Sequence, residues 1–159
     1  MPAAELHVYG GAATYAATKH AAAMAAVLDR ARVTPGVQVH PPVAKADLVD
    51  ALRASRVMLY RGDVGETFCL ALAEAQAVGV PAVVQPIGSV AERVRHGETG
   101  YVTPDPDRFA QHAISLLTDD ALWRAQQAAA VALQRGRGWA EAAGDFEGLL
   151  APDVPEIRR

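Results

Sequence analysis

Cysteine and lysine are both scarce in this sequence, and the shortage restricts the kinds of site that it can build. Cys69 is the single cysteine, which excludes a framework of internal disulfides and suits a reducing compartment, so we expect a cytoplasmic protein. Thirteen of the fifteen basic residues are arginines. The two lysines, Lys19 and Lys45, lie in no phosphate-binding lysine motif, so a lysine-based phosphate site is not expected.

Long apolar runs are also missing, although 51% of the 159 residues are hydrophobic. No stretch approaches the roughly 20 apolar residues of a membrane-spanning helix. Met1 is followed by Pro-Ala-Ala-Glu, and not by the basic region and apolar run of a signal peptide. The net charge of −3 gives no reason to expect nucleic acid or an anionic membrane as a partner. The five histidines show no metal-ligand spacing with acidic residues, so no metal site is predicted.

Patterns of strand and helix alternate along the chain, which predicts an α/β fold with a Rossmann-like, doubly wound parallel sheet of about five or six strands. A chain of 159 residues is long enough for one domain with a substantial core, which we place at residues 1–150. Residues 151–159 are expected to form a disordered tail.

The most informative stretch is a strand, a helix and a second strand in succession. Residues 56–60 and residues 81–86 are typical of strands, and the helix between them ends at Gly79. Thr67 is the expected N-cap of that helix. The apolar positions that repeat at helical spacing are Leu70, Ala73 and Ala77. Such a βαβ unit requires the two strands to be parallel.

In a βαβ unit the start of the helix lies at the carboxyl edge of the sheet, where open α/β folds bind their ligands. We therefore expect the free N–H groups of Phe68, Cys69 and Leu70 to point toward a ligand, and the helix dipole makes a phosphate suitable. Glu66 lies just before this edge, and Glu74 lies about two turns into the helix. A buried carboxylate at Glu74 needs a hydrogen-bond donor, and a pair of sugar hydroxyls would serve.

Several residues at the predicted edge have a structural explanation beside a functional one. The Cys69 thiol is either reactive, because it lies at a helix N-terminus, or simply small enough for a tight helix start, and we favour the second. The turn at Gly10 and Gly11 either lets a helix pack on the sheet or approaches a phosphate. His40, which ends a strand over residues 37–40, either contacts a base or belongs to the fold.

Capping patterns mark other helix starts. Ser89 and Glu92 form an S-x-x-E capping box, which explains both residues without a ligand. Asp105 is the expected N-cap of a helix with Pro106 at its first position. A last helix over residues 139–150 presents an apolar face.

Two segments resemble those of a known enzyme family. ETFCLALAEAQAVGVPAVV, residues 66–84, is similar to the E-x7-E segment of retaining glycosyltransferases of the GT-B fold, a group that includes glycogen synthases, sucrose synthases and many bacterial mannosyltransferases. GSVAERVRHGETGYVTP, residues 88–104, resembles the G-G-x-x-E-x-x-x-x-G-x-T-G-x-L-V segment of the same group. The likeness extends over residues 6–150, and the two segments in register are more specific than either alone.

The resemblance implies a nucleoside diphosphate sugar as substrate and no cofactor, and it assigns roles to residues that match the family pattern. Glu66 would contact hydroxyls of the donor sugar, and Glu74 the ribose hydroxyls of its nucleotide. The implied contacts to the donor sugar lie at Glu66, Thr67, Phe68 and Cys69. Those to the nucleotide lie at Glu74, Leu70, Pro42 and Val43. The residues expected near the donor phosphates are Gly10 and Gly11. No catalytic residue is assigned.

The chain departs from the family pattern in ways that bear on function. Glycine is usual in the family where this chain has Thr67 and often where it has Cys69, and the R-x-x-x-x-K-G segment whose cations clamp the diphosphate has no counterpart here. Family members also carry an N-terminal acceptor-binding domain, which this chain lacks. We therefore expect weakened donor binding, no activity in isolation, and an exposed apolar interface that could drive self-association.

The leading hypothesis is the donor-binding domain of a retaining, metal-independent glycosyltransferase that moves a sugar to an acceptor hydroxyl. One alternative is a standalone nucleotide or nucleotide-sugar binding module that works with a partner subunit. Another is a nucleotide-sugar epimerase relative on the same fold, because fold does not determine chemistry.

Overall fold

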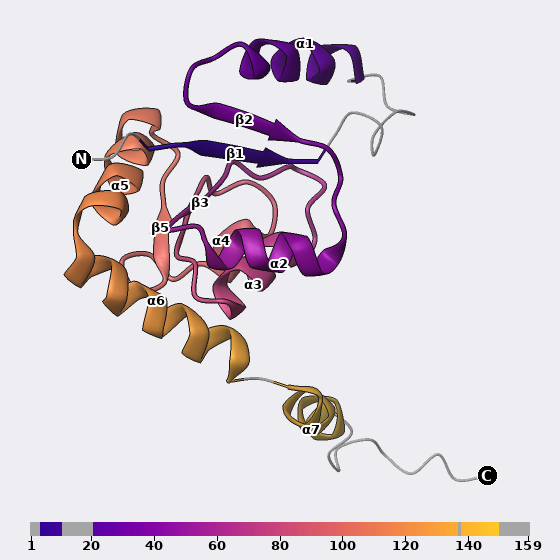
Figure 1. Ribbon diagram of the computed structural model, residues 1–159. Coiled ribbons are helices and arrows are strands. Elements are labelled where there is room, and N and C mark those ends of the chain that lie inside the picture. Colours follow the sequence, from indigo (N-terminus) through magenta and orange to yellow (C-terminus); the bar gives the residue numbers. More distant parts are fainter. Residues whose placement is uncertain (1–3, 11–20, 137, 150–159) are drawn as a thin grey trace, which may run out of the picture. The chain divides into compact units, whose positions relative to one another are not determined.

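The computed structural model describes residues 4–10, 21–136 and 138–149 (Figure 1). The chain divides into two compact units, Met1–Ala51 and Leu52–Arg159. The single domain that we place at residues 1–150 stays a prediction. The predicted C-terminal tail lies outside the described residues.

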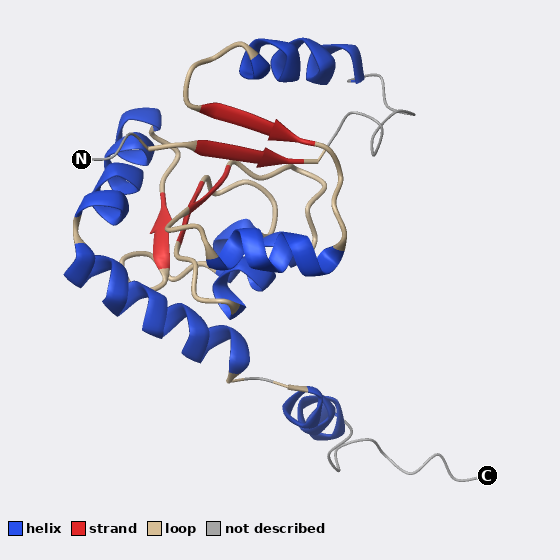
Figure 2. Ribbon diagram, in the orientation of Figure 1, coloured by secondary structure: helices blue, strands red, loops and turns tan. Residues whose placement is uncertain are grey.

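The first unit contains a pair of parallel strands joined by a helix (Figure 2). β1 (Leu6–Tyr9) and β2 (Val37–His40) pair along their full length, and β2 lies where the sequence predicts a strand. α1 (Ala21–Arg32) packs against β2. A parallel pair requires such a crossover, because both strands run in the same direction. α2 (Lys45–Arg53) follows β2 and spans the division between the two units.

The second unit contains a three-stranded parallel sheet in the order β3-β4-β5. β3 (Met58–Tyr60) and β4 (Ala82–Val84) are joined by α3 (Leu70–Ala77), so the predicted βαβ unit is confirmed. Between β4 and β5 (Gly100–Val102) the chain forms α4 (Val90–Arg93). β4 is the middle strand, and all of its residues are buried.

Three described helices follow the last strand. α5 (Pro106–Thr118) begins after Asp105, whose carboxylate accepts hydrogen bonds from two backbone N–H groups of the first turn, so the predicted N-cap is confirmed. α6 (Asp120–Arg135) begins in the same way at Asp119. α7 (Trp139–Leu149) has no buried residue. In the part of the chain that the structure describes, no helix is long and apolar enough to span a membrane.

Side chains of the middle strand alternate between two apolar clusters, one on each face of the three-stranded sheet. Ala82 and Val84 belong to the cluster that Leu72 of α3 completes. Val83 belongs to the other cluster, together with Leu116 of α5. Helices therefore cover both faces of this sheet, and the predicted α/β, doubly wound arrangement of parallel strands is confirmed for the second unit.

The sheet differs from the prediction in its continuity. The sequence predicts one sheet of about five or six strands, whereas the hydrogen bonds of the described strands form a two-stranded sheet and a three-stranded sheet. The apolar patterns locate each strand correctly, but they do not specify which strands are hydrogen-bonded neighbours.

The start of α3 also differs from the prediction. Cys69, and not Thr67, is the N-cap residue, and the helix begins at Leu70. The buried residues of α3 are Leu72, Ala75 and Gln76, whereas Leu70 is 66% exposed and does not belong to a buried stripe. α3 is apolar on nearly every side, so its sequence periodicity does not identify the face that packs.

Candidate functional site

The Glu66 carboxylate lies at the start of α3 and accepts two short hydrogen bonds. The Tyr60 hydroxyl donates to Oε2 at 2.9 Å, and the Cys69 backbone N–H donates to Oε1 at 2.9 Å. The bond from Tyr60, followed by the bond from the Cys69 amide, lowers the pKa of Glu66. Hydrogen bonds to a carboxylate favour its charged form, so Glu66 is held ionised and in one orientation.

The two donors to Glu66 are themselves partly or fully buried. Burial raises the pKa of the Tyr60 hydroxyl, and its hydrogen bond to Glu66 adds to the increase. Cys69 is 1% exposed, and burial likewise raises the pKa of its thiol. A buried thiol with a raised pKa is a poor nucleophile, so the structure favours the interpretation of Cys69 as a small residue at a tight helix start.

The backbone of Cys69 adopts a conformation that glycine reaches without strain. Its φ of 60° and ψ of 67° lie in the left-handed region, and no other non-glycine residue in the described ranges has a positive φ. A residue with a β-carbon in this region stores about 1–3 kcal/mol of strain. Such strain tends to gather at binding sites, and here it is located at the turn between Glu66 and α3.

One of the three amides expected to face a ligand at the start of α3 is occupied by the chain itself, which corrects that part of the sequence-based expectation. The Cys69 N–H, expected to point at a ligand, instead donates to Glu66. The chain's own carboxylate thus caps the positive end of the helix. The sequence-based prediction missed this bond because it depends on the conformation of the loop between Glu66 and Cys69, which helical periodicity does not specify.

A second loop packs closely against the segment that carries Glu66. Gly88 has a φ of +61°, and a β-carbon there would lie 2.3 Å from the Asp63 carbonyl oxygen. The Ser89 N–H donates to the Glu66 carbonyl at 3.0 Å. The loop after β3 and the loop after β4 therefore support one another at the same edge of the sheet, and Gly88 permits the close approach.

The capping box predicted at Ser89 and Glu92 does not form. The Ser89 side chain makes no capping hydrogen bond, and its Oγ atom is buried without a partner. The only link between the two residues is a backbone bond of 3.0 Å from the Glu92 N–H to the Ser89 carbonyl. Ser89 has a φ of −81° and a ψ of 0°, whereas a capping side chain requires the extended backbone that N-cap residues usually adopt.

Two residues at this edge were not identified from the sequence. Tyr60 holds Glu66, and Arg93 of α4 lies over the Phe68 ring with its guanidinium carbon 4.3 Å from the ring centroid. Phe68 itself is 48% exposed. An arginine often stacks on an aromatic side chain, so the residue types were compatible with this contact. The sequence does not show which arginine meets which aromatic ring.

The remaining predicted residues have different surroundings. Thr67 and Leu70 are exposed beside Glu66, and Glu74 is half-buried in the second turn of α3. The other predicted contacts belong to the first unit, where Pro42, Val43 and Gly10 are described and Gly11 lies outside the described residues.

The end of β2 has an aromatic stack in the same unit. His40 stacks on Tyr9 with ring centroids 4.4 Å apart and lies 3.0 Å from His7 between ring nitrogens. These contacts give His40 a role within the fold. Gly10 has a φ of 121°, a backbone conformation that favours glycine, and within the described residues no atom lies within 4 Å of a hypothetical β-carbon there.

A separate hollow of about 460 Å³ lies between the end of β5 and α5. It is lined by His96, Val102, Thr103, Pro104, Arg108, Gln111 and His112. Burial, followed by the neighbouring charges of His96 and Arg108, lowers the pKa of His112. The sequence predicts no site here.

Comparison with known proteins identifies the family. Residues 1–119 match the sequence model of the family described as "Glycosyl transferases group 1". This chain belongs to the group 1 glycosyltransferases. D-inositol 3-phosphate glycosyltransferase 1 of Catenulispora acidiphila is 36% identical to it over 108 residues, which cover 67% of this chain and 26% of that protein. N-acetyl-alpha-D-glucosaminyl L-malate synthase of Bacillus anthracis is 37% identical over 84 residues, 52% of this chain and 22% of that protein.

Solved structures share the fold of this chain. A crystal structure of Anabaena HepE in complex with UDP-glucose aligns with a TM-score of 0.74 at 19% identity, over 96% of this chain and 42% of that one. Sucrose-phosphate synthase from Thermosynechococcus elongatus aligns with a TM-score of 0.67 at 19% identity, over 94% of this chain and 46% of that one. The predicted Rossmann-like half of a GT-B fold is therefore confirmed. This group 1 glycosyltransferase chain spans about a quarter of the length of the curated relatives it matches.

Proposed function

We propose that this chain binds the donor, a nucleoside diphosphate sugar, for a retaining, metal-independent glycosyltransferase that moves the sugar to an acceptor hydroxyl. The observation that carries the proposal is the ionised Glu66 carboxylate held at the N-terminus of α3 by Tyr60 and Cys69. The HepE structure, described as a complex with UDP-glucose, supports a nucleotide sugar as the ligand class.

The proposal gives each group a part in donor binding. The Glu66 carboxylate accepts hydrogen bonds from hydroxyls of the sugar. The hydrogen bond from the Tyr60 hydroxyl keeps the carboxylate in place while it does so. The diphosphate lies near the positive end of α3, which stabilises the negative charge that develops on it as its bond to the sugar breaks. Glu74, in the second turn of α3, accepts hydrogen bonds from the ribose hydroxyls. Thr67, Phe68 and Cys69 border the sugar, and Leu70 borders the nucleotide.

Full transfer requires an acceptor site, which we assign to a part of the protein beyond these residues. The 26% coverage of the relative from Catenulispora acidiphila supports this assignment. We expect the chain of 159 residues to bind donors without transferring sugar. A nucleotide-sugar module with a partner subunit and an epimerase relative stay predictions that no contact in the described ranges favours.

An amide NMR titration tests the proposal. Uridine, guanosine and adenosine diphosphates and their sugar conjugates are added to the wild type, to Glu74→Ala and to Glu147→Ala, which removes an exposed carboxylate on α7. We expect one base to shift residues 66–74, with the shifts lost in Glu74→Ala and retained in Glu147→Ala. The absence of shifts with every ligand at millimolar concentration would refute donor binding by this chain.

A further inference from the structure

We propose that the hollow between the end of β5 and α5 binds a phosphate group, with the Arg108 guanidinium and the imidazoles of His96 and His112 as hydrogen-bond donors. These three side chains line the hollow. The inference goes beyond the proposed function, because none of the residues assigned to the sugar donor lines it. The site therefore stands or falls independently of donor binding.

The three side chains that can carry positive charge converge on the hollow from two segments. Arg108 and His112 are four residues apart and so lie on one side of α5. The His96 ring lies edge-on to the His112 ring, with the centroids 5.9 Å apart. Arg108 and His96 are exposed and His112 is half-buried, so a ligand in the hollow can reach them. Among the described residues, Arg108 forms no ion pair and the His112 ring has no hydrogen bond.

The backbone at the end of β5 holds the His96 ring in one orientation. Its Nδ1 atom lies 3.1 Å from the Val102 nitrogen and 3.0 Å from the Val102 carbonyl oxygen. Because the backbone occupies Nδ1, Nε2 is the ring nitrogen that is left for a ligand. In the protonated imidazole Nε2 is an N–H donor, so His96 presents a donor whose direction is set before a ligand arrives.

The charges around the hollow favour an anion over a metal cation. Burial, followed by the charges of His96 and Arg108, lowers the pKa of His112, and no carboxylate contributes to the shift. From β5, Tyr101 stacks on the His112 ring with centroids 3.8 Å apart. The Asp105 carboxylate, at the start of α5, accepts two backbone N–H bonds of the first turn. An anion removes the repulsion among the three positive groups, whereas a cation adds to it.

The remaining lining indicates what the phosphate is attached to. The hollow has a volume of about 460 Å³, which lies in the range of small-molecule pockets. Val102 and Pro104 add apolar surface, and Gln111 adds an amide. A phosphate monoester with a short organic body matches this combination, because the arginine and the histidines take the phosphate and the other side chains border the body.

Binding of the anion should be coupled to protonation of the histidines. A phosphate beside His112 favours its charged form and raises its pKa, so the complex takes up protons. Affinity should therefore rise as the pH falls toward the ordinary histidine pKa of about 6.5. Phosphate itself titrates near this pH, so the pH dependence is measured with sulfate, whose charge stays constant.

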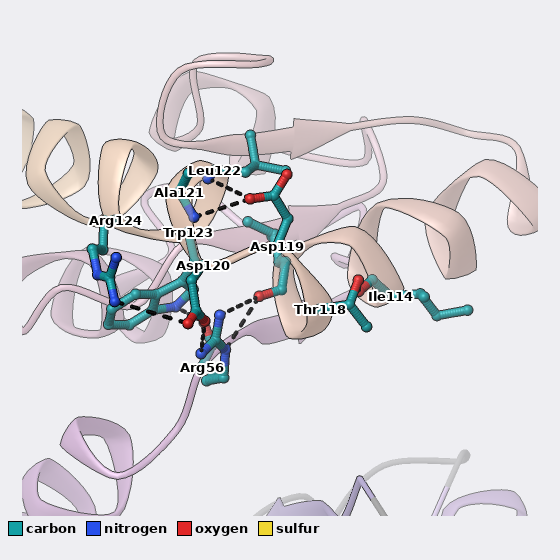
Figure 3. Close-up of polar contacts among 10 residues, drawn as sticks. Arg56, Ile114, Thr118, Asp119, Asp120, Ala121, Leu122, Trp123 and Arg124 are labelled. Carbon is teal, nitrogen blue, oxygen red and sulfur yellow. Dashed lines mark hydrogen bonds and ion pairs between the residues drawn. The ribbon is translucent and has the colours of Figure 1, made fainter. Parts of the chain in front are cut away.

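An NMR titration of the whole chain with sulfate, at constant ionic strength and at about pH 8 and about pH 6, tests the site through the ring C–H signals of His96 and His112. The variants are Arg108→Gln, His112→Gln and the matched control Arg124→Gln. Arg124 is an exposed arginine of α6 that pairs with Asp120 at 3.8 Å (Figure 3), so its removal changes the net charge equally. Amide spectra confirm that each variant is folded. Inorganic phosphate, glycerol phosphate and neutral glycerol are further probes.

We expect sulfate to shift both ring signals and to bind about fivefold more tightly at the lower pH. Arg108→Gln should weaken binding about fivefold, a modest loss because solvent screens this exposed charge. His112→Gln should reduce the pH dependence, and Arg124→Gln should match the wild type. Tighter binding of glycerol phosphate than of inorganic phosphate, with no binding of glycerol, would support a phosphate monoester as the ligand.

Three outcomes would overturn the proposal. The first is that no anion at millimolar concentration shifts the ring signals. The second is equal weakening of sulfate binding in Arg108→Gln and Arg124→Gln, because it would show general attraction to a charged surface and no site. The third is a shift of both ring signals by Zn²⁺ together with none by sulfate or phosphate, which would identify a metal site in place of an anion site.

Discussion

Glu66 has two donors in this structure, the Tyr60 hydroxyl and the Cys69 amide, and they contribute differently to the proposed function. A diphosphate at the start of α3 competes with the carboxylate for the Cys69 amide. A sugar hydroxyl approaches the carboxylate without displacing Tyr60, because each carboxylate oxygen accepts more than one hydrogen bond. Tyr60 is therefore the residue that keeps Glu66 oriented when the donor is bound.

Tyr60→Phe removes this hydroxyl and should raise the pKa of Glu66 toward its ordinary value, since the Tyr60 bond is the largest cause of the lowered pKa. A lowered carboxylate pKa stabilises the fold above the unfolded value, and this stability is lost as the pH falls through the folded pKa. In the variant this contribution to stability should be smaller, and its loss should be complete at a higher pH, because the folded pKa lies closer to the unfolded one. Carbon NMR titration of the Glu66 carboxyl measures the shift, with Tyr101→Phe as control. An unchanged Glu66 pKa in Tyr60→Phe would show that the amide alone holds the carboxylate.

Gly88→Ala tests the close packing of the two loops. Its β-carbon would lie 2.3 Å from the Asp63 carbonyl oxygen, and its φ of +61° is strained for alanine. We expect the free energy of unfolding to fall by about 2 kcal/mol or more, as judged by urea denaturation. Gly144→Ala is the control, because a β-carbon there meets nothing within 4 Å and alanine favours the helix. Equal stability of the two variants would contradict the packing described here.

At the scale of the element, the helices with the clearest start signals are those that the structure reproduces. Asp105 and Asp119 both accept two backbone N–H bonds from the first turns of α5 and α6. These caps form because the carboxylate and its partners are close in sequence. The N-cap residue of α3, Cys69, makes no side-chain capping bond. The Glu66 carboxylate from the preceding loop accepts a hydrogen bond from the Cys69 N–H instead.

Asp119→Ala should lower the free energy of unfolding by about 1 kcal/mol, because two N–H groups at the start of α6 lose their acceptor (Figure 3). Asp119→Asn should retain most of the stability, since asparagine caps nearly as well as aspartate. Thermal unfolding of the three proteins measures the effect. A loss as large in the asparagine variant would mean that charge, and not capping, stabilises the helix start.

At the scale of the whole molecule, burial is concentrated around the middle strand of the second unit. Ala82, Val83 and Val84 are all 0% exposed, whereas Trp139 on α7 is 93% exposed. Stability is then unevenly distributed, because opening β4 exposes both apolar clusters and opening α7 exposes little that is buried.

Amide hydrogen exchange should therefore be slowest in β4 and fast in α7. β4 is hydrogen-bonded to a strand on each side, and helices cover both faces of the sheet. Its amides therefore exchange only when the second unit opens as a whole. Mass spectrometry of peptic fragments, or NMR, measures the order. Slower exchange in β1 and β2 than in β4 would contradict the placement of the most stable core in the second unit.

Several features of the candidate site were predicted wrongly, and the reasons are physical. The amide at Cys69 is occupied, Thr67 is not the N-cap, and the Ser89 capping box is absent. Each depends on a backbone conformation that the loop adopts only when it is packed. The partner of Arg93 was missed altogether, because Phe68 lies in another segment of the chain.

By itself, the sequence determined the order of strands and helices, the parallel βαβ unit and the cap at Asp105. Those features depend on local periodicity and on side chains that bond to neighbours in the chain. Only the tertiary structure decided that Glu66 caps α3 and that Arg93 stacks on Phe68 without an acceptor. Such contacts arise where loops from separate strands converge at one edge, and no short-range pattern records which side chains meet there.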